Sequence, residues 1–159
     1  MEKNNFKVML YIKKDTENEQ VFFKTDGQRF STDKTIKLTV DTSYGFSVIT
    51  RPPQIIQNIS VMGTNVNTTE MTGDSSSLTY TFSWPSTGTQ LTTKGKRDIL
   101  PVVLEVKDNG SLTMNLQIKF YKLEDKQHYT WGTPLNHIEF ECESKSGTSF
   151  VDIVKQTYR

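Results

Sequence analysis

One short segment near the carboxyl end of this sequence gathers residue types that could do chemistry. Residues 128–142, HYTWGTPLNHIEFEC, contain both histidines, the only cysteine and one of the two tryptophans. A cysteine next to a histidine can act as a nucleophile, provided that sulfur and imidazole lie within hydrogen-bond reach. Whether these side chains can meet depends on the elements that carry them.

The second half of this segment alternates as a strand does. Ile138, Phe140 and Cys142 are separated by polar residues, and a strand points successive side chains to opposite faces. We therefore expect Cys142 to face the core and His137 to face away from it. His128 lies beyond a turn and stays a possible neighbour, but a lone cysteine on an apolar face is usually a small core residue. We predict a structural cysteine and no catalytic residue.

Metal and phosphate sites are weakly supported as well. His137, Glu139 and Glu141 share a strand face and have the donor types of a metal site, but alternating charges on an exposed strand are ordinary. The segment 85–97, PSTGTQLTTKGKR, has glycines and a lysine without the spacing of a phosphate-binding loop. The sequence therefore predicts no enzyme, no metal and no cofactor.

The composition favours an all-β protein. The 159 residues suit one domain, 1–159, and contain no alanine but many Thr, Val, Ile and aromatic residues. With 19 basic and 18 acidic residues, the chain lacks the strong positive charge of a dedicated nucleic-acid binder. The start MEKNNFKVMLYIKK has no signal-peptide pattern, no apolar run reaches about 18 residues, and one cysteine allows no internal disulfide. We expect a soluble, cytoplasmic protein.

Period-2 alternation recurs along the chain and predicts about nine or ten strands, which is typical of an antiparallel β-barrel or sandwich. Asn109-Gly110 is the clearest hairpin turn. Residues 150–158 fit a last strand or a short helical turn. Large side chains of inward parity are expected to fill the interior: Phe6, Phe23, Phe30, Phe46, Tyr80, Phe82, Trp84, Phe120 and Phe140.

Strand parity also predicts where the loops lie. If each strand crosses the sheet once, loops 85–97 and 123–136 lie at one end, and loop 63–77 lies with the Asn109-Gly110 turn at the other. Basic residues of the first loop would then neighbour His128 and Trp131. We interpret Trp131 first as a plug for this end of the barrel, and second as an interface anchor. The predicted partner-binding residues are Lys94, Lys96, Arg97, His128 and Trp131.

Several segments closely resemble the cannabinoid receptor-interacting protein family. The specific ones are Phe-Lys-x-Asp-Gly-Gln-Arg-Phe at 23–30, Thr-Ile-Lys-Leu at 35–38, Lys-Phe-Tyr at 119–121, Trp-Gly-x-Pro at 131–134 and Ile-Glu-Phe-Glu-Cys at 138–142. Their order and spacing are kept over most of the chain, whereas residues 63–97 depart most. The chain is identified as a divergent member of the family.

The resemblance implies a small cytosolic β-barrel or sandwich, similar in fold to the proteins that solubilise prenylated GTPases. Members of the family that the chain resembles bind the cytoplasmic C-terminal tail of a cannabinoid receptor and modulate signalling through G proteins, without known enzymatic activity. A lipid-modified G-protein segment is a second candidate partner, and contact with the inner face of the plasma membrane is expected only through a partner.

Two function classes remain open, with an enzyme as a distant third that needs His128 beside Cys142. An adaptor would bind a receptor tail by strand addition or in a surface groove. A carrier would hold a lipid chain in an apolar cavity. The many large inward side chains favour a filled interior and hence the adaptor.

Overall fold

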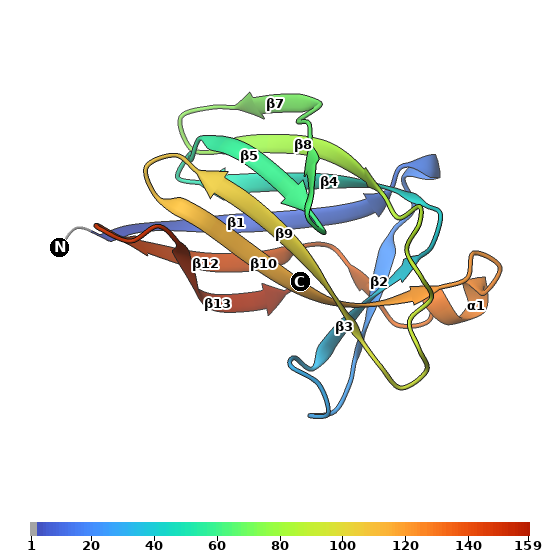
Figure 1. Cartoon of the computed structure of the whole chain (residues 1–159). Coiled ribbons are helices and arrows are strands. Elements are labelled where there is room, and N and C mark those ends of the chain that lie inside the picture. Colours follow the sequence, from blue (N-terminus) through green and yellow to red (C-terminus); the bar gives the residue numbers. More distant parts are fainter. Residues whose placement is uncertain (1–2) are drawn as a thin grey trace.

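The computed structural model describes residues 3–159 and consists of two β-sheets stacked on each other (Figure 1). Thirteen strands are present in this range, where the sequence predicted nine or ten; the short β6, β7 and β11 account for the difference. The elements are β1 Lys3–Lys14, η1 Thr16–Asn18, β2 Val21–Thr25, β3 Lys34–Thr39, β4 Ser43–Arg51, β5 Ile56–Val61, β6 Thr64–Val66, β7 Glu70–Gly73, β8 Leu78–Pro85, β9 Asp98–Val106, β10 Gly110–Tyr121, α1 Lys126–Tyr129, β11 Thr133–Leu135, β12 Ile138–Lys145 and β13 Val151–Tyr158.

The two sheets differ in the order of their strands. The first sheet has the order β13-β12-β1-β4-β8-β7, and the second has the order β11-β2-β3-β10-β9-β5-β6. Both sheets are open, so the protein is a β-sandwich and not a closed barrel. The expected all-β class is confirmed. Among the named strands of residues 3–159, β3 and β10 form the one parallel pair, which brings two segments far apart in the sequence side by side.

The core lies between the sheets, where the alternating apolar residues meet. Phe46 and Phe82 are register partners on β4 and β8, and their rings stack with centroids 5.2 Å apart. Cys142 is buried as expected. The prediction of an interior position is wrong for one aromatic residue, Phe30. This residue lies half-buried in the loop after β2, where the Arg97 guanidinium carbon lies 4.4 Å from its ring centroid. The other eight are buried in the core cluster.

The edges of the sheets offer little for another strand to pair with. The edge strands β6, β7 and β11 have only three, four and three residues. The edge strand β13 is longer, but a register shift opposite Glu141 and Cys142 leaves Val154 without a ladder partner. Short strands and bulges are common ways to prevent edge-to-edge association.

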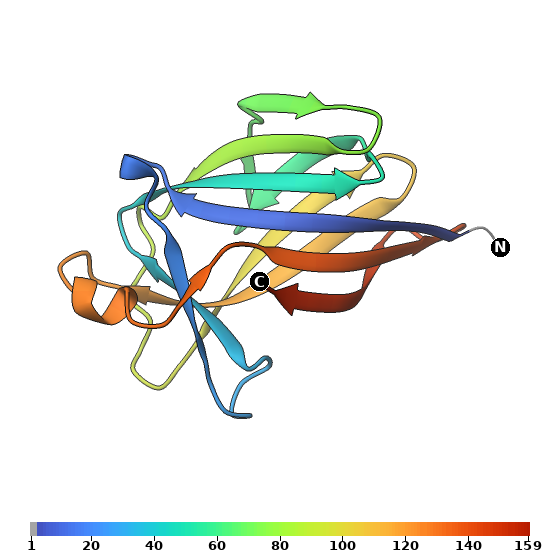
Figure 2. The same ribbon diagram turned by 180° about the vertical axis from the view of Figure 1, so that it is seen from behind.

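The two ends of the sandwich differ. Both views show α1 at one end and the turn between β9 and β10 at the other (Figures 1 and 2). At the turn end, the side chains of Asn4, Gln54 and Asn109 hydrogen-bond to one another and close the sandwich with a polar cluster. The α1 end is the one with a hollow surface.

Removing a core ring tests this packing. We expect Phe82→Ala to lower the free energy of unfolding by about 3–5 kcal/mol, because it leaves a cavity against Phe46. The control, Val154→Ala, removes a side chain that is 65% exposed and should change it by less than about 0.5 kcal/mol. Urea denaturation measures both; equal losses in the two variants would contradict the described core.

Candidate binding groove

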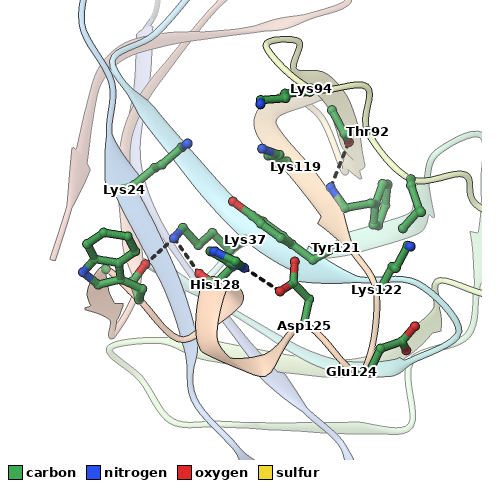
Figure 3. A pocket seen from close by; sticks show the side chains of 14 residues that line it. Lys24, Lys37, Thr92, Lys94, Lys119, Tyr121, Lys122, Glu124, Asp125 and His128 are labelled. Carbon is green, nitrogen blue, oxygen red and sulfur yellow. Dashed lines mark hydrogen bonds and ion pairs between the residues drawn. The ribbon is translucent and has the colours of Figure 1, made fainter.

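A groove of about 950 Å³ opens at the α1 end, on the outward face of β2, β3 and β10 (Figure 3). The loop that precedes β9 and the segment that contains α1 flank it. Five lysines and two carboxylates line it, which gives the lining a net charge of +3, while the whole chain has a net charge of +1. The remainder of the chain is therefore at −2. We call this site the basic groove, and its charged lining consists of Lys24, Lys37, Lys94, Lys119, Lys122, Glu124 and Asp125.

Three of the lysines come from adjacent strands. Lys37 on β3 is the register partner of Lys119 on β10, and Lys24 on β2 pairs with Thr35, two residues before Lys37. Because side chains alternate along a strand, these three point away from the core, while Ile36 and Leu38 on β3 point into it. The apolar–polar alternation that builds the sandwich thus also gathers the lysines on one face.

Lys37 is the buried member of this row, only 7% exposed. Its ammonium group donates hydrogen bonds to the backbone carbonyl oxygens of His128, at 2.8 Å, and of Trp131. It also lies 5.6 Å from the ring centroid of Tyr121. Because a buried charge requires hydrogen-bond partners, Lys37 ties α1 and the segment after it to the face of β3.

Gly132 allows this segment to lie close to β2. Its φ is 151°, and a Cβ at this position would lie 2.6 Å from the carbonyl oxygen of Phe23. A side chain there would push the segment away from the strand, so the residue after Trp131 has to be glycine for the groove to keep its shape.

The lysines on β2, β3 and β10 form the floor of the groove, where their ammonium groups are partly buried and repelled by neighbouring positive charges. Burial is the main cause that lowers the pKa of Lys24, Lys37 and Lys119, and the positive charges of neighbouring groups lower these pKa values further. Lys119 lies 5.1 Å from the centroid of Tyr121 and has no ion pair with any described carboxylate. An anion in the groove would relieve the repulsion among these ammonium groups.

Arg97 fixes the loop on the other side of the groove. Its Nη2 and Nε donate to the two carboxylate oxygens of Asp26 at 2.9 and 3.1 Å, and both side chains are largely buried. Thr35 donates to the same carboxylate. Two parallel hydrogen bonds between a guanidinium and a carboxylate are strong and directional, so this pair joins the loop before β9 to the β2–β3 hairpin.

The structure brings together three of the five predicted binding residues. Lys94, His128 and Trp131 line the basic groove, so the two loops do meet as strand parity predicted. Lys96 is exposed on the same loop but does not line the groove, and Arg97 is paired with Asp26. His128 Nδ1 lies 2.5 Å from an oxygen of Asp125.

Trp131 does not plug the end of the sandwich. Trp131 is 73% exposed, while its backbone carbonyl oxygen accepts the hydrogen bond from Lys37. The interpretation of this residue as a plug is therefore wrong. Trp84, the other tryptophan, is 5% exposed and belongs to the core.

Lys24, Lys37 and Lys119 were not among the predicted site residues. Two signals could have found them: each has the polar parity of a strand with an apolar opposite face, and each lies in a segment that carries the family resemblance, at 23–30, 35–38 and 119–121. The parallel pairing of β3 with β10 was the missing information.

The structure places the residues first considered for chemistry in separate surroundings: Cys142 in the core and His128 in the lining of the groove. Burial raises the pKa of the Cys142 thiol to about 12, so the nucleophilic thiolate is not populated near neutral pH. Glu139 pairs with Arg159 at 3.2 Å, and the His137 ring lies 5.0 Å from that of Tyr11. Among residues 3–159, no cluster of three His, Cys, Asp or Glu side chains has an arrangement suited to a metal ion.

The fold and the site define a β-sandwich protein with a basic groove at one end. No helix within the described residues has the length and apolar character needed to cross a membrane. The family model described as CB1 cannabinoid receptor-interacting protein 1 matches residues 2–158.

Proteins of that name are similar to this chain over most of its length. The Mus musculus protein is 33% identical over 142 residues, and the Bos taurus and Homo sapiens proteins are 32% identical over 143 residues. In each case the match covers 87% of this chain and 86% of the relative. The chain belongs to the CB1 cannabinoid receptor-interacting protein family, as the resemblance of its motifs indicated.

The Arg97–Asp26 pair makes a stability prediction. Asp26→Asn should lower the free energy of unfolding by about 1–3 kcal/mol at neutral pH, because Arg97 then keeps its buried charge without a carboxylate. The control Asp33→Asn removes a carboxylate that is 55% exposed beside Lys34 and should cost less than about 1 kcal/mol. Chemical denaturation gives both values.

The same variant tests the pH dependence. Burial by itself would raise the pKa of Asp26, but hydrogen bonds from Arg97 and Thr35 and the charge of Arg97 lower it below its ordinary value. A carboxyl group with a lowered pKa in the folded state stabilises the protein above its unfolded pKa and loses this effect as the pH falls. The stability difference between wild type and Asp26→Asn should thus shrink below pH about 4; a constant difference would contradict the pairing.

The thiol provides a separate prediction. Because Cys142 is 3% exposed and its pKa is raised, thiol reagents should not label it in the folded protein near pH about 8 but should label it at once in denaturant. Absorbance of a disulfide reagent follows the reaction. Rapid labelling of the folded protein would show that the thiol is accessible and reopen the nucleophile hypothesis.

Proposed function

We propose that this protein is a non-enzymatic adaptor that binds the cytoplasmic C-terminal tail of a cannabinoid-type G-protein-coupled receptor in the basic groove. The observation that carries the proposal is the origin of the groove. Its floor lysines and Trp131 come from the segments 23–30, 35–38, 119–121 and 131–134, which resemble a family of receptor-interacting proteins. In this proposal the protein acts in the cytoplasm, at the inner face of the plasma membrane, and modulates signalling through the receptor.

The chemistry of the groove favours an acidic tail segment. Lys94, Lys119 and Lys122 make no ion pair with a described carboxylate and can offer their ammonium groups to carboxylates of a peptide. Leu91 and Trp131 add apolar contacts at the mouth, and exposed tryptophans are frequent anchors of interfaces.

The other predicted residues have supporting positions in this proposal. Lys96 adds positive charge beside the groove and speeds association with an acidic partner. Arg97 is a positioning residue, because its pairing with Asp26 fixes the loop that carries Lys94. His128 contributes its backbone carbonyl to Lys37 and its ring to the lining.

A groove suits this partner better than strand addition does. Strand addition requires a long, regular edge, and the edge strands of this protein are short or, in β13, interrupted by a bulge. The basic groove, in contrast, is already open, with a volume of about 950 Å³.

The alternative function, a carrier for a lipid chain, is not favoured. Buried aromatic and aliphatic side chains fill the space between the sheets, and a lipid tail in the basic groove would have to remove water from its ammonium groups without pairing them. A lipid-modified G-protein segment, the second partner that the resemblance implies, would have to bind outside this core.

Peptide binding tests the proposal. The double variant Lys24→Gln and Lys119→Gln should weaken the binding of an unlipidated receptor-tail peptide about ten-fold or more, because both ammonium groups lie in the floor of the groove. Titration calorimetry at low and high salt measures it, and the wild-type affinity should fall as salt rises.

The matched control is Lys7→Gln with Lys155→Gln, which removes two exposed lysines of the first sheet. It should leave the affinity unchanged within about two-fold. Equal effects of the two double variants, or binding that requires a lipid on the peptide, would overturn the assignment.

A further inference from the structure

Exposed apolar side chains gather on the two segments that flank the basic groove. Leu91 is 44% exposed, Leu123 is 46% exposed and Trp131 is 73% exposed. Leu91 and Trp131 line the groove from opposite segments, and Leu123 lies between the lining residues Lys122 and Glu124. We call segments 86–97 and 122–132 the rim. Single exposed apolar residues are ordinary on any surface, but a group of three at one site is not.

Lysines accompany these apolar residues along the rim. Lys94 and Lys122 line the groove, and Figure 3 shows them on different segments. Lys96 and Lys126 lie on the same segments and are exposed. None of the four forms an ion pair with a carboxylate among the described side chains. The rim therefore presents both apolar side chains and uncompensated positive charge.

We propose that the rim of the basic groove binds directly to the surface of a bilayer that contains anionic phospholipids, with Trp131 inserted among the headgroups. This proposal goes beyond receptor binding and does not depend on it. Tryptophan prefers the boundary between headgroups and acyl chains, and lysines near an anionic bilayer each add favourable electrostatic free energy.

The distribution of charge favours a bilayer over a small anion. A planar anionic surface acts on the whole protein, so net attraction requires that the positive charge lie on the side that faces it. Here the groove lining has a net charge of +3 while the remainder of the chain has −2, so such a surface attracts the face that carries the groove and not the chain as a whole. Met71, an exposed apolar residue elsewhere, lies next to Glu70 and has no such attraction.

The two tryptophans make a direct test possible. Trp131 is 73% exposed while Trp84 is 5% exposed, so a change in tryptophan emission on adding vesicles reports on Trp131. With vesicles of phosphatidylcholine and phosphatidylserine, we expect a blue shift of the emission, protection from a soluble quencher and co-sedimentation of the full chain. Vesicles of phosphatidylcholine alone and soluble glycerophosphoserine should give no shift.

Matched variants locate the contact. Lys94→Gln with Lys122→Gln should weaken partitioning into the anionic vesicles about five-fold for each lysine removed, while Lys7→Gln with Lys155→Gln should leave it nearly unchanged. Trp131→Ala should weaken co-sedimentation several-fold, whereas Val154→Ala, at a side chain 65% exposed on β13, should not.

Any of three results would overturn the proposal of bilayer binding. These are no binding to anionic vesicles, an equal emission shift with soluble glycerophosphoserine, or equal effects of the two lysine pairs. Co-sedimentation without an emission shift would mean that another face adsorbs to the bilayer and would also overturn it. Vesicles contain no receptor, so these results are independent of peptide binding.

Discussion

The buried ammonium group of Lys37 is the contact on which the groove depends. It lies between the cationic side chains of adjacent strands, where repulsion would otherwise drive them apart. Two backbone carbonyl oxygens, of His128 and Trp131, partly compensate its charge, and they belong to the segment that forms one wall of the groove. One interaction thus stabilises the middle of the lysine row and holds in place the wall that carries Trp131. Lys119 keeps its ammonium group free of any ion pair with a described carboxylate, and Lys24 shares Asp26 with Arg97.

Arg97 and the lysines show two uses of positive charge. Arg97 is satisfied within the protein by Asp26, and its planar guanidinium makes the two parallel hydrogen bonds that a lysine cannot make. The lysines of the groove carry most of the uncompensated charge at this end. The near-neutral composition hides this arrangement, because 19 basic and 18 acidic residues balance over the chain but not over its surface. A receptor tail and an anionic bilayer would contact the protein at the same end. The two proposals are compatible, because the cytoplasmic tail of a membrane receptor begins at the bilayer.

Local patterns predicted the strands well, because alternation reports directly on which side chains face the core. The burial of Cys142 follows from this alternation, and the meeting of loops 85–97 and 123–136 follows from the assumption that each strand crosses its sheet once. The predictions that failed concern residues whose surroundings come from segments distant in sequence. Phe30 packs against Arg97 and not in the core, and Lys37 on β3 binds the backbone carbonyl of Trp131. The lysine row was missed for the same reason, since strand parity gives the face of a side chain but not which strands pair.

The central claim is that the receptor-interacting surface of this protein is the basic groove. The most direct test is a ¹H–¹⁵N correlation spectrum of the labelled protein during titration with an unlabelled peptide of the cytoplasmic tail of the CB1 cannabinoid receptor. The account predicts that the indole N–H resonance of Trp131 shifts while that of the buried Trp84 does not, together with the backbone amides around Lys37 and Lys119. Shifts along the edge strand β13 with an unchanged Trp131 signal would contradict it.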